Sequence, residues 1–147
     1  EQACDIFMQR GRDKDIAFEM QALVDGWTDM LTDRKAPIEL MRLLKKKGVH
    51  LYYLSNISKE TLKTLSQRKY WQLFDGGVAS SDIGALKPDP KMYQTLLDKY
   101  KLIPEETIFA DDHKPNAAVA PEHGITGIHF KNLKRSCKIL VDYGIYT

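Results

Sequence analysis

The stretch TIFADDHKPNAAVA, residues 107–120, places two adjacent aspartates between a short apolar run and a run of small residues. The apolar run predicts a buried strand and the small residues predict a helix, so Asp111 and Asp112 stand where the strand ends. Adjacent carboxylates repel each other, and they are tolerated only with a cation, hydrogen-bond donors or open water around them. The pair therefore indicates either a metal site or a solvated turn in which one acid caps the next helix.

The rest of the chain alternates between the same two kinds of segment. Residues 51–54, within VHLYYLS, are continuously apolar or aromatic and predict a strand that is buried on both faces. Two further strands are predicted at GGVASS (residues 76–81) and ITGIHF (residues 125–130). Helices are predicted to begin near Pro37, Ser58, Pro90 and Asn132. This alternation predicts an α/β fold with a Rossmann-like parallel sheet flanked by helices.

Composition and charge narrow the class of protein. The chain has 147 residues, enough for one domain with a core, and its net charge of +2 is too small to indicate nucleic acid or a membrane surface as a partner. No apolar run approaches the roughly 18 residues of a membrane span, and no signal peptide is visible. The two cysteines, Cys4 and Cys137, have no metal-like spacing and favour a reducing cytoplasm. Because the chain begins with Glu1, we expect a processed, trimmed or partial product.

Polar residues follow the predicted strands at the points where these strands end. Ser55 and Asn56 end one strand, and Asp111 and Asp112 end another. Between them in the sequence, Lys87 lies in GALKPDP, where the prolines favour an extended loop in front of a helix. Since ligands of parallel α/β sheets collect at the carboxyl ends of the strands, we expect these five side chains on one rim.

The residue types on this rim suit phosphoryl transfer. Paired carboxylates are hard oxygen ligands for Mg²⁺, which usually takes one or two of them together with a phosphate oxygen. Ser55 and Asn56 stand just before a helix N-terminus, where backbone N–H groups and the helix dipole favour an anion. Lys87 offers a positive charge for a phosphate. A nucleophile is the one part that these residues do not supply.

Three segments carry a resemblance to a known family: LYYLSNIS, GALKPDPKMY and TIFADDHKPNAAVAPEHGI. They resemble, in that order, the second, third and fourth motifs of the haloacid dehalogenase superfamily, and most closely its phosphatases with a helical cap. The resemblance implies that Ser55 holds the substrate phosphate with Asn56 beside it. It also implies that Lys87 steadies the nucleophile and the phosphate, and that Asp111 and Asp112 bind Mg²⁺.

The same resemblance implies how the chain is divided and what it lacks. Residues 1–33, whose apolar positions fall mostly at helical intervals from Asp5 onward, resemble the rear part of the cap, and residues 34–147 resemble the core. The family's first motif, a strand that ends in the aspartate nucleophile, is absent, so we expect a gap at the centre of the sheet and no activity from this chain alone. FDGG (residues 74–77) resembles that motif, but it lies between the second and third motifs and is rejected.

Three functions remain open at this stage. The first is a Mg²⁺-dependent phosphomonoesterase that acts on a small phosphorylated metabolite through an aspartyl-phosphate, with its nucleophile upstream of this chain. The second is a metal-free 2-haloacid dehalogenase, for which two adjacent acids would be a liability. The third is a non-catalytic module that binds phosphate and Mg²⁺, or a protein partner at unpaired strand edges. The sequence does not specify the oligomeric state.

The remaining polar residues are predicted to be structural. Asn116 is expected to support the loop after the paired acids, and His113 is expected to face solvent at the edge of the site. His50, His123 and His129 share no spacing and are predicted to be ordinary surface or core residues.

Overall fold

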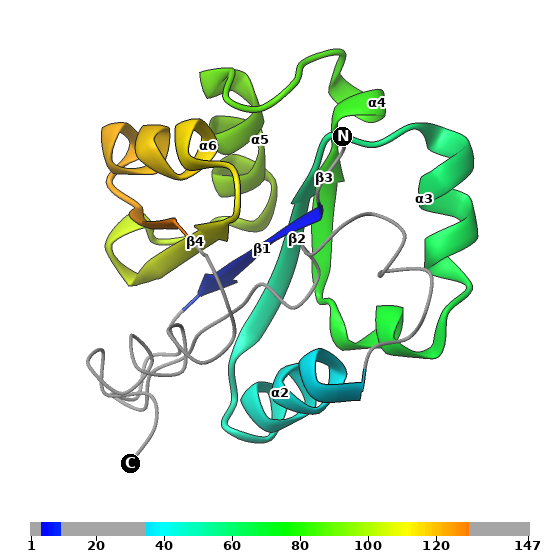
Figure 1. Ribbon diagram of the computed structural model, residues 1–147. Coiled ribbons are helices and arrows are strands. Elements are labelled where there is room, and N and C mark those ends of the chain that lie inside the picture. Colours follow the sequence, from blue (N-terminus) through cyan, green and yellow to red (C-terminus); the bar gives the residue numbers. More distant parts are fainter. Residues whose placement is uncertain (1–3, 10–34, 130–147) are drawn as a thin grey trace.

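Five strands form one sheet in the computed structural model, which describes residues 4–9 and 35–129 (Figure 1). The spatial order is β3-β2-β1-β4-β5. The strands are β1 (Cys4–Gln9), β2 (His50–Ser55), β3 (Gly76–Ala79), β4 (Thr107–Asp111) and β5 (Thr126–His129). The α-helices are α2 (Lys35–Lys46), α3 (Lys59–Ser66), α4 (Ser80–Ile83), α5 (Pro90–Tyr100) and α6 (Lys114–Val119). Short 3-10 helices are η1 (Lys69–Leu73), η2 (Pro104–Glu106) and η3 (Ala120–His123).

The strands β2 to β5 form the predicted parallel arrangement. β2 pairs with β3 in parallel and β4 pairs with β5 in parallel. Both β2 and β4 are antiparallel to β1, so they run in the same direction as each other. The carboxyl ends of these four strands therefore lie at one edge of the sheet, as the α/β prediction requires.

The central strand β1 departs from the sequence prediction. Helical spacing was predicted from Asp5 onward and a gap was expected at the centre of the sheet, and both are wrong for Cys4–Gln9. This strand lies antiparallel between β2 and β4, with Cys4 opposite Ser55 and Ile6 opposite Ala110. A short apolar run does not distinguish a strand from a helix by periodicity, and here the unpaired backbone groups of β2 and β4 favour a strand.

Other predictions for the two ends of the chain lie outside the described residues. They comprise the rest of the cap segment, residues 10–33, and the helix expected at about 132–143. Within residues 4–9 and 35–129, no helix has the length and apolar character needed to cross a bilayer.

Helices cover both faces of the sheet, which explains the continuous apolar run in β2. Leu51 packs in the cluster under α2 and α3, whereas Tyr52 and Leu54 pack in the cluster under α5 (Figure 1). Consecutive strand residues point to opposite faces, so a strand covered on both sides has no polar face. Tyr53 is half-buried beside Trp71 and Phe74 on the α2 face.

Capping residues set where the helices begin. The Ser58 hydroxyl accepts a hydrogen bond from Thr61 N at the start of α3, and Asp89 accepts one from Lys91 N at the start of α5. These caps satisfy N–H groups that have no partner inside the helix. The loop with Lys87 lies directly before α5, so its position is fixed by a capped helix.

Asp75 lies at the amino end of the sheet, far from Ser55 along β2. Its carboxylate accepts a hydrogen bond from Leu51 N at 2.8 Å, and Lys45 Nζ lies 2.7 Å from each of its oxygens. This position agrees with the rejection of FDGG as a nucleophile motif, because the candidate site lies at the carboxyl ends of the strands.

Two side chains of α5, Lys99 and Tyr100, occupy the outer edge of β3. Gly77 N donates to the Tyr100 hydroxyl at 2.7 Å, and that hydroxyl lies 3.0 Å from Gly77 O. Lys99 Nζ donates to the same carbonyl at 3.2 Å. A side chain at Gly76 would collide with the Tyr100 ring, so glycine permits this close approach.

Candidate functional site

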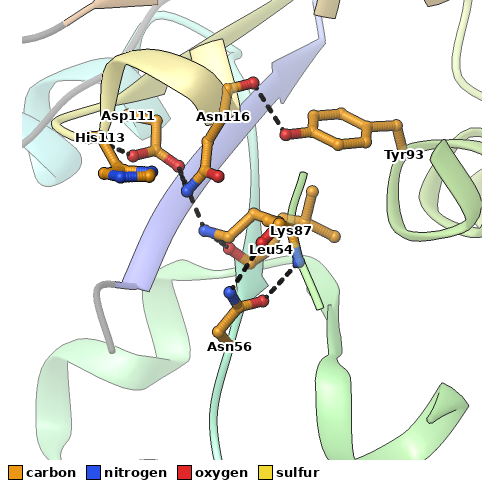
Figure 2. Close-up of polar contacts among 7 residues, drawn as sticks. All are labelled: Leu54, Asn56, Lys87, Tyr93, Asp111, His113 and Asn116. Atoms are coloured by element: carbon orange, nitrogen blue, oxygen red, sulfur yellow. Dashed lines mark hydrogen bonds and ion pairs between the residues drawn. The ribbon is translucent and has the colours of Figure 1, made fainter. Parts of the chain in front are cut away.

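The predicted site residues do converge at the carboxyl edge of the sheet. β2 ends at Ser55 and β4 ends at Asp111. The loop before α5 brings the Lys87 ammonium between Leu54 O and Asp111 Oδ2 (Figure 2). Ser55 and Asp111 are fully buried and Lys87 is 5% exposed, whereas Asn56 and Asp112 are partly exposed. The partly exposed residues therefore form the accessible side of the site.

Asn56 fastens the loop that carries Lys87. Its carboxamide oxygen accepts a hydrogen bond from Lys87 N at 2.7 Å, and its Nδ2 donates to Lys87 O at 3.2 Å. This pair of bonds uses both polar atoms of the side chain on the backbone of one residue (Figure 2). The structure thus gives Asn56 a positioning contact that the sequence did not predict.

The Lys87 ammonium is enclosed by acceptors. Nζ donates to Leu54 O at 2.7 Å and lies 3.3 Å from Asp111 Oδ2. The side chains of Lys87 and Asp111 are 1% and 0% exposed, so this is a buried ion pair. The Phe109 ring lies on one side of the ammonium, with its centroid 5.7 Å from Nζ. A charge held in such surroundings has a fixed position, because few other groups could satisfy it.

Asp111 is saturated with hydrogen-bond donors. Its Oδ2 accepts from Asn116 Nδ2 at 2.8 Å in addition to Lys87, and its Oδ1 accepts from His113 N at 2.6 Å (Figure 2). Asn116 is in turn held by Tyr93, whose hydroxyl donates to Asn116 O at 2.8 Å. Burial and the charge of Asp111 raise the pKa of Tyr93, so this hydroxyl stays protonated and remains a donor. Asn116 is therefore the structural support that the sequence predicted.

Asp112 has the opposite environment, although it is the next residue. Its Oδ1 is buried and has no hydrogen-bond partner among the described residues. Burial, and next the negative charge of Asp111, raise the pKa of Asp112 to about 6. A buried carboxylate oxygen without a donor is unfavourable by itself and is the kind of atom that a cation would satisfy.

His129 was predicted to be an ordinary residue, yet it contacts the loop of the paired acids. It is the last residue of β5 and pairs in register with Asp111. Its Nε2 lies 2.8 Å from the carbonyl oxygen of Asp112. The signal in the sequence was its place next to the last residue of a predicted strand, close to the criterion that identified Ser55 and Asp111.

Within the described part of the chain, no three side chains of the His, Cys, Asp and Glu types gather closely enough to hold a metal ion. The fit to a divalent cation therefore rests on the paired acids and, within that pair, on the donorless oxygen of Asp112. Mg²⁺ commonly completes its coordination with waters and substrate phosphate, so a set of one or two carboxylates is compatible with this ion.

Known proteins similar to this chain include two phosphatases. The sesquiterpene phosphatase astK of Aspergillus oryzae is 36% identical over 99 residues, which cover 67% of this chain and 50% of the relative. A phosphorylated carbohydrates phosphatase of Thermotoga maritima is 24% identical over 104 residues, which cover 70% of this chain and 48% of the relative. The chain thus spans about half the length of these curated relatives.

A structural match and a match to a family model both describe the class of this chain. The structure of an uncharacterized protein from Corynebacterium glutamicum matches with a TM-score of 0.69, covering 84% of this chain and 89% of that chain at 23% identity, which shows the fold. The sequence model of the haloacid dehalogenase-like hydrolases matches residues 6–124. Because this match covers most of the chain, the protein belongs to the haloacid dehalogenase-like hydrolase family.

Proposed function

We propose that the complete protein is a Mg²⁺-dependent phosphomonoesterase acting on a small phosphorylated metabolite. The observation that carries this proposal is the pair of unlike aspartates at the end of β4, one bonded to Lys87 and the other left with a donorless oxygen. The names of the two phosphatase relatives support it. The aspartate that would attack phosphorus and carry the aspartyl-phosphate is assigned to a segment upstream of these residues.

Each residue of the site has a separate task in this proposal. Asp112 would offer its Oδ1 to Mg²⁺. Asp111, the other predicted ligand, also accepts hydrogen bonds from Lys87, Asn116 and the backbone N–H of His113. When bound, Mg²⁺ supplies positive charge that neutralises phosphate oxygens and orients the ester. Lys87 would add a fixed positive charge, and Ser55 would donate its hydroxyl to a phosphate oxygen.

The metal-free 2-haloacid dehalogenase fits the site less well. Such chemistry would leave the Asp112 carboxylate half-buried beside Asp111, and the charge of Lys87 and a backbone hydrogen bond offset its raised pKa only in part. A divalent cation removes this cost, because it prefers the ionised carboxylate. The phosphatase is therefore the better assignment.

A non-catalytic binding module is favoured by one separate observation. β1 closes the centre of the sheet, so the described strands form a continuous sheet without the nucleophile strand. A continuous sheet supports folding of this chain alone, and a folded chain with Asp112 and Lys87 in place could hold Mg²⁺ and phosphate without turnover. The division into a cap at residues 1–33 and a core at residues 34–147 stays a prediction, with Cys4–Gln9 now in the core sheet.

The test is hydrolysis of p-nitrophenyl phosphate by the longest open reading frame that contains these residues. We expect turnover that EDTA abolishes, that Asp112→Asn lowers at least 100-fold, and that Asp98→Asn, a change to an exposed acid on α5, leaves unchanged. Turnover that persists in EDTA, or in Asp112→Asn, would overturn the phosphatase proposal. Mg²⁺ binding without any turnover would favour the binding module.

A further inference from the structure

His129 makes a contact that strand pairing alone would not provide. β4 ends at Asp111, so the carbonyl oxygen of Asp112 lies one residue beyond the last pair between β4 and β5. His129, from the end of β5, reaches this oxygen with its Nε2 at 2.8 Å. The imidazole therefore takes the place of a backbone donor for a carbonyl group that has left the sheet.

The direction of this hydrogen bond follows from the chemistry of the two atoms. A carbonyl oxygen only accepts, so Nε2 carries the proton and donates. Both the neutral Nε2–H tautomer and the charged imidazolium satisfy this requirement. The contact is thus retained whether or not His129 is protonated.

The backbone of the two acids is held from both sides. His113 N donates to Asp111 Oδ1 at 2.6 Å, which closes the turn after β4. His129 holds the carbonyl group of Asp112, the residue between Asp111 and His113. The Oδ1 atom of Asp112 has no such restraint, because no described group donates to it. The backbone contacts therefore contribute to the position from which Asp112 presents this oxygen.

We propose that His129 is a positioning residue that holds the Asp112 backbone so that the donorless carboxylate is presented to a divalent cation. This inference rests on the proposed function, and it adds a residue that the sequence predicted to be ordinary. Groups that orient metal ligands typically contribute 10- to 100-fold in metal affinity. His129 acts through Asp112 and contacts neither ion nor substrate in this proposal.

The experiment measures Mg²⁺ binding to this 147-residue chain by isothermal titration calorimetry, so that turnover is not needed. We expect His129→Leu to raise the Mg²⁺ dissociation constant about tenfold, because leucine fills similar space but has no hydrogen-bond donor. His129→Gln places an amide N–H near the position of Nε2, and we expect its affinity within about threefold of the parent. The matched control is His50→Leu, at an exposed histidine of the opposite sheet edge, which should bind Mg²⁺ like the parent.

The outcomes separate this inference from the proposed function. A parent chain that binds Mg²⁺ no better than Asp112→Asn overturns the proposed metal site and the inference with it. A parent that binds Mg²⁺ while His129→Leu binds equally well, or while His129→Gln binds as weakly as His129→Leu, overturns the inference alone.

A second measurement does not depend on the folding of any variant. Nitrogen NMR of the histidine side chains in the parent should show a proton on Nε2 of His129, and Mg²⁺ should shift this resonance more than that of His50. A neutral His129 with its proton on Nδ1 would contradict the hydrogen bond and overturn the inference.

Discussion

The two ends of the sheet each place an aspartate beside a strand terminus, and the surroundings of these two carboxylates are opposite. At the amino end, Asp75 accepts from Lys45 and from Leu51 N, and His50 Nδ1 lies 3.7 Å away. At the carboxyl end, Asp112 has a buried oxygen without a donor among the described residues. The Asp75 carboxylate is satisfied by groups of the protein itself, whereas Asp112 keeps a buried oxygen that we propose is offered to a cation. The same residue type thus acquires its role from its donors.

The largest expected effect concerns the buried pair next to Asp112. Lys87→Met should lower the free energy of unfolding by about 3 kcal/mol or more, because it leaves the buried Asp111 carboxylate without its cation. Urea unfolding followed by circular dichroism measures this change. The double variant Lys87→Met/Asp111→Leu should recover part of the loss, since it removes both charges. A loss under 1 kcal/mol in the single variant would mean that Asn116 and His113 N suffice for Asp111.

The second effect tests the amino end directly. Asp75→Ala should lower the free energy of unfolding by about 1–3 kcal/mol, because it leaves Leu51 N without its acceptor and removes the partner of Lys45. The same urea measurement applies, with Asp98→Asn as the control at an exposed position. Unchanged stability would show that water replaces the carboxylate. Asp75 would then not stabilise the fold, and the contrast with Asp112 would not hold.

The smallest effect has the opposite sign and depends on pH. The pKa of Asp112 is raised to about 6 in the fold from the ordinary value of 3.8, so ionisation costs folding stability as pH rises through this interval. Without divalent cations, Asp112→Asn should therefore stabilise the protein above about pH 6, by about 1 kcal/mol once solvent screening of a half-exposed group is allowed for. The gain should fade as pH falls toward 4.

Melting temperatures of the parent and Asp112→Asn in EDTA, taken across pH 4–8, check this sign. Mg²⁺ should reverse the order above pH 6, because it stabilises only the chain that keeps the carboxylate. A variant that is less stable than the parent at pH 7.5 in EDTA would show that the buried Oδ1 of Asp112 has a donor.

Strands β2 to β5 and the meeting of Ser55, Lys87 and Asp111 could be predicted, because both depend on short-range patterns. LYYL has no polar face and therefore needs helices on both sides, and parallel strands bring their carboxyl ends to one edge. The unlike environments of Asp111 and Asp112 could not be predicted. They depend on Asn116, His113 N and Lys87, whose distances are set by packing of α5 and α6 on the sheet.

The position of β1 in the sheet and the contact of His129 could not be predicted from the sequence, for a similar reason. Six residues with a short apolar run suit a strand or a helix equally well, and the choice is made by β2 and β4, which lie more than 40 positions further along the chain. The His129 contact goes to a backbone carbonyl, and no side-chain pattern marks a carbonyl that lies beyond the end of a strand.

The α5 side chains that cover β3 affect whether this protein can associate with other copies of itself through its sheet. An edge strand with bare N–H and C=O groups invites another strand to add to the sheet, which leads to dimers or aggregates. At Gly77 both groups are already taken by the Tyr100 hydroxyl and the Lys99 ammonium. Addition of a strand there would first have to remove two side chains of the protein itself, so β3 is protected against edge-to-edge assembly at its centre.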